Sequence, residues 1–219
     1  MAGLIDHTLL GPTASRAAVN TLCAEAEEHG FASVCVNPCH VRAARERLRG
    51  VAIPVCAVVG FPHGMGTPEA KAFEAERAVE DGARELDMVM NIGALRDGDD
   101  AAVLADIRAV CDVRDRAPEP VVVKVILQTD TLDGDEQKAR AARLAKDAGA
   151  DFVKTSTGFG ASGATVDDVA LLRQTVGDDL GVKASGGIRD YDTALAMIEA
   201  GATRIGASRS VSIVDGAPE

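Results

Sequence analysis

Aromatic residues are scarce in this chain of 219 residues: they make up 3% of the sequence, with one tyrosine and no tryptophan. Proteins that bind oligonucleotides or glycans by stacking depend on such rings, so the composition disfavours both classes. Basic residues are outnumbered as well, with 23 Lys and Arg against 34 Asp and Glu and a formal net charge of −11. Because an acidic surface repels phosphate backbones, we expect no nucleic-acid partner.

The sequence also lacks an apolar run of the roughly 18 residues that a membrane-spanning helix needs, and it begins without the basic and apolar regions of a signal peptide. The cysteines are odd in number and have no paired spacing: Cys23, Cys35, Cys39, Cys56 and Cys111. We expect free thiols in a reducing cytoplasm. Cys35, Cys39 and His40 lie close together, but a structural zinc site needs four ligands and no second half is present. The expectation is therefore a cytoplasmic protein without a membrane or metal partner.

The chain instead alternates short apolar runs with amphipathic stretches. The apolar, β-branched runs predict strands at residues 4–7, 33–37, 55–61, 85–91, 121–127, 151–156, 182–185 and 204–207. The stretches rich in Ala, Glu and Arg predict helices at residues 14–29, 39–49, 67–82, 99–116, 134–148, 165–176 and 190–200. Several strands are apolar throughout, as strands covered on both faces of a parallel sheet are.

The ends of the predicted helices agree with this division. Residues typical of helix N-caps stand at their starts: Thr13, Thr67, Asp133, Thr165 and Asp190. Repeated β-then-α units predict an α/β protein, a closed (β/α)₈ barrel that forms a single domain over residues 1–219, with a short final helix after residue 208. The alternative is an open doubly wound sheet, which would carry a glycine-rich dinucleotide turn after its first strand; this chain has Thr-Leu-Leu-Gly-Pro there.

Charged residues interrupt the predicted strands near their C-terminal ends, where barrels hold their chemistry. These residues are Asp6, Asp87, Lys124, Lys154 and Lys183. The whole chain has only six lysines, so three of them on predicted strands are not explained as ordinary surface residues. A charge within an apolar strand is costly unless it is paired. Ion pairing as simple packing would explain each residue separately, but the five together favour a reactive cluster.

Such a cluster suits imine formation with a carbonyl substrate. A lysine amine attacks a carbonyl only after losing its proton, and both burial and a neighbouring cation favour that loss. Lys154 and Lys183 fall on adjacent predicted strands, about 4.8 Å apart in a sheet, so Lys183 would supply the cation. Asp87 could carry protons between the imine and its enamine.

Two glycine- and serine-rich turns predict a separate phosphate site. The segment Ser-Gly-Gly-Ile-Arg follows the seventh predicted strand at residues 185–189, and Gly-Ala-Ser-Arg ends the eighth at residues 206–209. Barrel phosphate sites often use the loops after strands seven and eight, where glycine lets backbone amides approach the anion. Ordinary tight turns are the alternative, but an arginine in each turn, Arg189 and Arg209, favours phosphate.

Seven segments in this order and spacing give the chain a family resemblance. They are LIDHTLL (4–10), SVCVNP (33–38), VVGFPHG (58–64), ELDMVMNIGAL (85–95), FVKTSTGF (152–159), KASGGIR (183–189) and RIGAS (204–208). Together they resemble the deoxyribose-phosphate aldolases, class I aldolases with a (β/α)₈ fold. The resemblance covers about residues 3–212, and the pairing of VKTSTG with KxxGGIR is its most specific part.

The resemblance implies a reaction and a set of roles. The reaction would be reversible cleavage of 2-deoxy-D-ribose 5-phosphate to D-glyceraldehyde 3-phosphate and acetaldehyde, in deoxyribose phosphate catabolism, without a cofactor or metal. Lys154 would be the Schiff-base lysine, with Lys183 and Asp87 assisting proton transfer. The resemblance and the two glycine-rich turns together give the remaining predicted substrate-binding residues, which are Asp6, Thr8, Cys35, Lys124, Thr155, Gly158, Gly186, Gly187, Arg189, Gly206, Ser208 and Arg209.

Three departures from the family pattern bear on affinity and turnover rather than on the reaction class. Some members carry Lys where this chain has Phe159, which removes one cation for the phosphate. Arg209 stands where some members have Ser and could compensate. Some members end in a mobile tail with a terminal tyrosine that assists proton transfer, whereas this sequence ends Gly-Ala-Pro-Glu at residue 219.

Two other functions remain open from the sequence. One is a related Schiff-base barrel aldolase that acts on another sugar phosphate; the other is a non-catalytic barrel that binds sugar phosphates. The presence of both Lys154 and Asp87 disfavours the second. Sugar phosphates and aldehydes are the expected small-molecule partners, and by analogy with barrel aldolases the chain is expected to be a homo-oligomer, a dimer.

Overall fold

The computed structural model describes residues 1–217, and its strands close into a barrel with each strand parallel to the next. The strands are β1 (Ile5–Leu9), β2 (Ser33–Val36), β3 (Val55–Val59), β4 (Glu85–Val89), β5 (Val122–Ile126), β6 (Phe152–Lys154), β7 (Gly181–Ser185) and β8 (Arg204–Ala207). They follow one another around the barrel in chain order, and β8 pairs with β1. The predicted (β/α)₈ architecture is therefore confirmed, and the open sheet is excluded.

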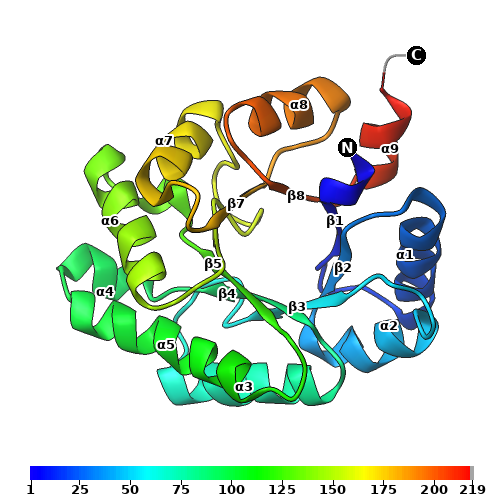
Figure 1. Cartoon of the computed structure of the whole chain (residues 1–219), viewed down its shortest axis with the longest axis horizontal. Helices are drawn as coiled ribbons and strands as arrows, with labels where there is room; N and C mark the ends of the chain where they lie inside the picture. The colour runs from blue at the N-terminus through cyan, green and yellow to red at the C-terminus, as the bar shows by residue number, and fades with distance from the viewer. Residues whose placement is uncertain (218–219) are drawn as a thin grey trace.

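Helices surround the strands as an outer ring (Figure 1). They are α1 (Arg16–His29), α2 (Val41–Arg47), α3 (Pro68–Glu80), α4 (Ile92–Asp97), α5 (Asp100–Arg116), α6 (Gly134–Asp147), α7 (Val166–Val176), α8 (Tyr191–Glu199) and α9 (Ser210–Asp215). Short 3₁₀ turns occur at η1 (Ala2–Leu4), η2 (Pro38–His40) and η3 (Thr129–Thr131). Within residues 1–217, every helix is too short or too polar to cross a bilayer.

Most predicted elements lie within two residues of their expected positions, with local exceptions. The helix α4 was not predicted, because six residues are too few to show a helical period. The α1 helix is capped by Ser15, whose side chain accepts from the amide of Ala18, and not by Thr13. Asp133 stands at the start of α6 but makes no side-chain cap hydrogen bond. The prediction about a terminal tyrosine concerns the end of the chain, where residues 218 and 219 lie outside the described residues.

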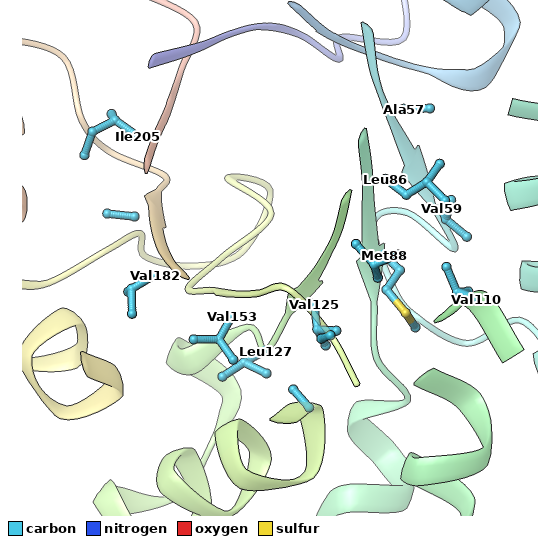
Figure 2. Packing of buried hydrophobic residues seen from close by; sticks show 14 of the residues in the cluster. Ala57, Val59, Leu86, Met88, Val110, Val125, Leu127, Val153, Val182 and Ile205 are labelled. Carbon is cyan, nitrogen blue, oxygen red and sulfur yellow. The ribbon is translucent and has the colours of Figure 1, made fainter. Parts of the chain in front are cut away.

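The main core lies between the strands and the helices. Figure 2 shows Val125, Val153 and Val182 among the apolar side chains packed in this layer, and all three are fully buried. Alternate residues of the same strands face the barrel axis, and it is there that the charged residues lie. The apolar layer thus holds the strands in place while their inward faces are left for polar side chains.

A buried ion pair fixes α3 and α5 to the end of β4. Lys71 is 1% exposed, and its Nζ donates to Asp106 Oδ2 at 2.7 Å and to the carbonyl of Val89 at 2.8 Å. Asp106 Oδ2 also accepts from the amide of Asn91 at 2.8 Å. The two side chains therefore hold the C-terminal end of β4, the strand that carries Asp87.

Replacing Lys71 by methionine should lower the free energy of unfolding by about 3–5 kcal/mol, because it leaves the Asp106 carboxylate buried without its cation. The double variant Lys71→Met/Asp106→Asn should recover much of that loss, because the side-chain oxygen at position 106 is then uncharged and can still accept from the backbone amide of Asn91. Chemical denaturation of both variants measures the difference. A loss below about 1 kcal/mol for Lys71→Met, the size typical of solvated pairs, would contradict a dry, coupled pair.

Candidate active site

A cavity of about 330 Å³ opens among the loops that follow β1, β6, β7 and β8. Lys154 is the last residue of β6, lines this cavity and has a side chain that is 4% exposed. Lys124 and Lys183 are fully buried and do not line it. Of the three barrel lysines, Lys154 is thus the one placed to meet a ligand.

Below Lys154, the Asp87 carboxylate joins all three lysines. Its Oδ2 accepts from Lys154 Nζ and from Lys183 Nζ, each at 2.7 Å. Its Oδ1 accepts from Lys124 Nζ at 2.9 Å and from Cys56 Sγ at 3.2 Å. Burial opposes the charge on Asp87, but the three ammonium groups outweigh it and hold the pKa of this carboxyl well below its usual range. Asp87 therefore stays ionised.

Strand register explains why these side chains meet. Lys154 is in register with Lys183 across β6 and β7, and Asp87 is in register with Lys124 across β4 and β5. In-register residues of parallel neighbours point to the same side of the sheet. In a closed barrel, two such pairs that face inward approach one another across the axis.

A second group of ion pairs lies on the other side of Lys183. Lys183 Nζ donates to Asp6 Oδ2, and Arg204 donates to Asp6 Oδ1 at 2.6 Å. Burial favours the neutral forms, yet the ion pairs prevail: the pKa of Asp6 is lowered, and the pKa of Lys183 is raised by Asp6 and Asp87. Lys183 is consequently a fixed cation that shares the Asp87 carboxylate with Lys154.

The expected position of these charges near the strand ends was wrong for four of the five residues. Asp6, Asp87, Lys124 and Lys183 lie within their strands, deep in the barrel, and only Lys154 ends its strand. Asp87, Lys124 and Lys183 each lie two residues before the end of their strands, and β1 continues past its predicted end to Leu9, three residues beyond Asp6. The structure shows the ion pairing, since the buried pairs surround the one barrel lysine that reaches the cavity; a reactive role for the cluster stays a prediction.

The predicted phosphate turns form one end of the cavity. The backbone φ angles of Gly158, Gly186 and Gly187 are +83°, +87° and +79°, values that residues with a Cβ rarely adopt. Within residues 1–217, the amides of Gly187 and Ser208 donate to no protein acceptor. Exposed amides held by such turns form anion sites, so this end of the cavity suits a phosphate.

Two arginines add positive charge at that end. Arg189 and Arg209 line the cavity and are exposed. Across the described part of the chain, neither has a carboxylate within 4.0 Å, whereas many other arginines are paired. Phe159, next to Gly158, adds an apolar side chain to the cavity wall: it is 53% exposed and packs edge-on against Phe61, with ring centroids 5.4 Å apart.

The structure divides the predicted substrate-binding residues into two sets. The cavity is lined by Thr8, Gly158, Gly186, Gly187, Arg189, Gly206, Ser208 and Arg209. The side chains of the other four are fully buried and lie off the cavity wall: Asp6, Cys35, Lys124 and Thr155. Thr155 Oγ1 instead bridges β6 to β7, since it donates to the carbonyl of Ser185 and accepts from its amide. Direct contact of these four with a substrate stays a prediction.

Sequence reasoning missed three side chains that contact the buried ion pairs. Glu85 Oε2 accepts from Lys124 Nζ at 2.5 Å and from Arg204 at 3.1 Å, and Cys56 lies against Asp87. Glu85 could have been found, because it precedes Asp87 by two residues and therefore shares its face of β4. Arg204 at the start of β8 and Cys56 within β3 carried no comparable signal.

The donor atoms of Cys35, Cys56 and Asp87 lie within 4.8 Å of one another, a spacing that could hold a metal ion. Three ammonium groups already occupy the Asp87 oxygens, and Lys124 Nζ contacts Cys56 Sγ at 3.5 Å. Burial also raises the pKa of the Cys56 thiol well above its usual value, so it stays protonated. Because a metal would compete with these cations and protons, the donor set is a poor fit for one.

Comparison with known proteins identifies close relatives. A family model described as DeoC/LacD family aldolase matches residues 1–213. The deoxyribose-phosphate aldolase of Geobacillus sp. (strain WCH70) is 57% identical over 216 residues, which cover 99% of this chain and 95% of that protein.

Solved structures agree with these sequence matches. The tetrameric deoxyribose phosphate aldolase from Aeropyrum pernix is 33% identical with a TM-score of 0.91, covering 98% of this chain and 89% of that one. A structure named QR15, an aldolase, is 39% identical with a TM-score of 0.90 and covers 98% and 94%.

Proposed function

Because this chain belongs to the DeoC/LacD family of aldolases, we propose that its barrel is the catalytic unit of a class I aldolase. The enzyme is a lyase that reversibly cleaves 2-deoxy-D-ribose 5-phosphate to D-glyceraldehyde 3-phosphate and acetaldehyde. One observation carries the assignment to this site: Lys154 reaches a cavity with a phosphate-suited end while it shares the Asp87 carboxylate with the buried cation Lys183.

Lys154 is the nucleophile in this proposal. Its neutral Nζ attacks the C1 aldehyde of the open-chain sugar, and loss of water from the carbinolamine forms the protonated imine. Removal of the C3 hydroxyl proton then breaks the C2–C3 bond, and the bonding electrons move into the imine to form an enamine. D-Glyceraldehyde 3-phosphate leaves, the enamine takes a proton at C2, and hydrolysis releases acetaldehyde and restores Lys154.

Asp87 and Lys183 support the proton transfers. Asp87 Oδ2 lies 2.7 Å from the Nζ atoms of both lysines, so the ionised carboxylate can hold both groups in place and pass protons transiently between Lys154 and the bound substrate, while Lys183 balances its charge. Since the iminium nitrogen receives the electrons, the reaction needs no metal or other cofactor. The positively charged end of the cavity would hold the phosphate and place C1 at Lys154.

Reductive trapping tests this proposal. Treatment with acetaldehyde and sodium borohydride should reduce the imine and leave a single ethyl group on Lys154, detected by intact mass and located by peptide mapping. The barrel lysines Lys124 and Lys183 serve as internal controls, because both are fully buried. A folded protein that forms no adduct, or one that is modified at Lys183, would contradict the assignment. Coupled detection of D-glyceraldehyde 3-phosphate would then show whether the substrate is cleaved at all.

The cellular setting is also part of the proposal. The absence of a bilayer-spanning helix within residues 1–217 and the metabolic substrate support action in the cytoplasm, in deoxyribose phosphate breakdown. The relative from Aeropyrum pernix is a tetramer, which supports a homo-oligomer; the dimer stays a prediction.

A further inference from the structure

The loop between β6 and α7, residues 157–163, forms one wall of the cavity, and its first three residues line it. The loop also packs on the glycine turn after β7. A Cβ added at Gly163 would lie 2.1 Å from the carbonyl oxygen of Gly186, and the amide of Ala164 donates to that carbonyl at 3.0 Å. The position of the loop therefore helps to set the shape of the phosphate end.

Two side chains from the end of β5 hold this loop at both ends. Gln128 Oε1 accepts from the amide of Thr157 at 2.9 Å, and Gln128 Nε2 donates to Asp130 Oδ1 at 2.7 Å. Asp130 Oδ2 accepts from the amide of Ser162 at 3.0 Å. A Cβ at Gly160 would lie only 2.2 Å from Gln128 Nε2. The middle of the loop thus packs directly on the side-chain amide of Gln128 and the carboxylate of Asp130, which are hydrogen-bonded to each other.

The backbone of Gln128 is unusual. Its φ of +54° is left-handed, and it is the single residue other than glycine with a positive φ among residues 1–217. The side chain is nearly buried, at 4% exposure, and the carbonyl accepts from the amide and hydroxyl of Thr131 at 2.9 and 2.8 Å. Such conformations persist where surrounding contacts enforce them and often occur at functional sites. Gln128 lies outside both the cavity wall and the ionic cluster, so its effect on a substrate has to be indirect.

We propose that Gln128 and Asp130 are positioning residues for the phosphate end of the cavity, acting through the loop 157–163 and the Gly186 turn beneath it. The inference rests on the proposed function in assigning the phosphate to this end. It predicts that these side chains govern recognition of the phosphate while the chemistry at Lys154 proceeds without them, because neither side chain contacts the lysine cluster.

The test compares phosphorylated with unphosphorylated substrate. In Gln128→Leu and Asp130→Ala, the KM for 2-deoxy-D-ribose 5-phosphate should rise about tenfold, as expected for the loss of one to two hydrogen bonds, with kcat within about twofold. The value of kcat/KM for 2-deoxy-D-ribose, which lacks the phosphate, should be unchanged. Asp130→Asn keeps one acceptor and should give an intermediate KM. Asp133→Ala is the matched control, since Asp133 is exposed and pairs only with Arg96 among the described residues.

The outcomes separate this inference from the proposed function. The positioning role would be overturned if kcat/KM fell equally for both sugars, or if the KM of the variants were like that of Asp133→Ala. Turnover by the wild type would still support the aldolase in either case. If the wild type cleaves neither sugar, the aldolase proposal fails, and calorimetry with inorganic phosphate tests the loop directly: the two variants should bind it about tenfold more weakly. Unchanged phosphate affinity would overturn the inference. Melting curves check folding, and Asp130→Ala, at a half-buried site, carries the test if Gln128→Leu does not fold.

Discussion

The variant Lys154→Ala should lose at least about 10⁴-fold in kcat for 2-deoxy-D-ribose 5-phosphate, because removal of a covalent nucleophile leaves only binding and electrostatic effects. It should also form no adduct with acetaldehyde and borohydride. The phosphate end of the cavity is formed by residues of the loops that follow β6, β7 and β8 and not by the Lys154 side chain, so affinity for inorganic phosphate should be retained. Turnover and intact-mass measurements on the same preparation check both expectations.

Lys154→Arg is the matched variant. It keeps a cation beside Asp87, so it preserves the charge of the buried cluster but removes the amine that forms the imine. If both variants are inactive, the missing nucleophile is responsible rather than a disturbed ion pair. Substantial turnover in either variant, or an adduct that moves to another lysine, would contradict the role of Lys154.

The variant Lys183→Leu should lower kcat/KM by about 10²–10⁴-fold, the range typical of an acid–base group. Without Lys183, the Asp87 carboxylate loses one of the two ammonium groups that share its Oδ2, so the proton transfers at Lys154 lose their balancing cation. Steady-state kinetics at pH 7 measure the loss. A wild-type rate at pH 7 would contradict the two-lysine arrangement.

The buried charges also determine how the stability of the folded protein depends on pH. Asp6 and Asp87 raise the pKa of Lys183 above its usual value, so this ammonium stays charged at neutral pH. Its stabilising contribution is fully present below about pH 10.4, the unfolded value, and is lost as the pH rises through the raised value. Asp6 keeps Arg204 and Lys124 as partners after the substitution, so Lys183→Leu should still fold; circular dichroism provides the control.

The alternation of apolar runs with amphipathic stretches was sufficient to predict the barrel. A run such as Val55–Val59 is too apolar to lie at a surface, and each following stretch offers one apolar face to cover it. Local signals also placed three caps correctly, since the side chains of Thr67, Thr165 and Asp190 accept from amides at the starts of their helices. Short-range patterns do not depend on distant partners, so the sequence alone determined these features.

The candidate site was predictable in composition but not in arrangement. Lys154, Lys183 and Asp87 stood out because charges are rare on apolar strands, and the glycine turns because of their place after the last two strands. Periodicity cannot show that Asp87 Oδ2 lies between two ammonium groups, because that contact joins residues 67 and 96 positions apart in the chain.

Only the tertiary structure shows which of the three lysines reaches the cavity. Lys124, Lys154 and Lys183 are alike in the sequence, each an isolated charge on a strand. Closure of the barrel buries Lys124 and Lys183 completely and leaves Lys154 at the end of β6, against the cavity. The left-handed backbone of Gln128 was likewise not predictable from the sequence, since it occurs together with contacts to the loop packed over it. The sequence by itself determined the elements and the kinds of charge, whereas exposure and shared partners depend on how distant strands meet around the axis.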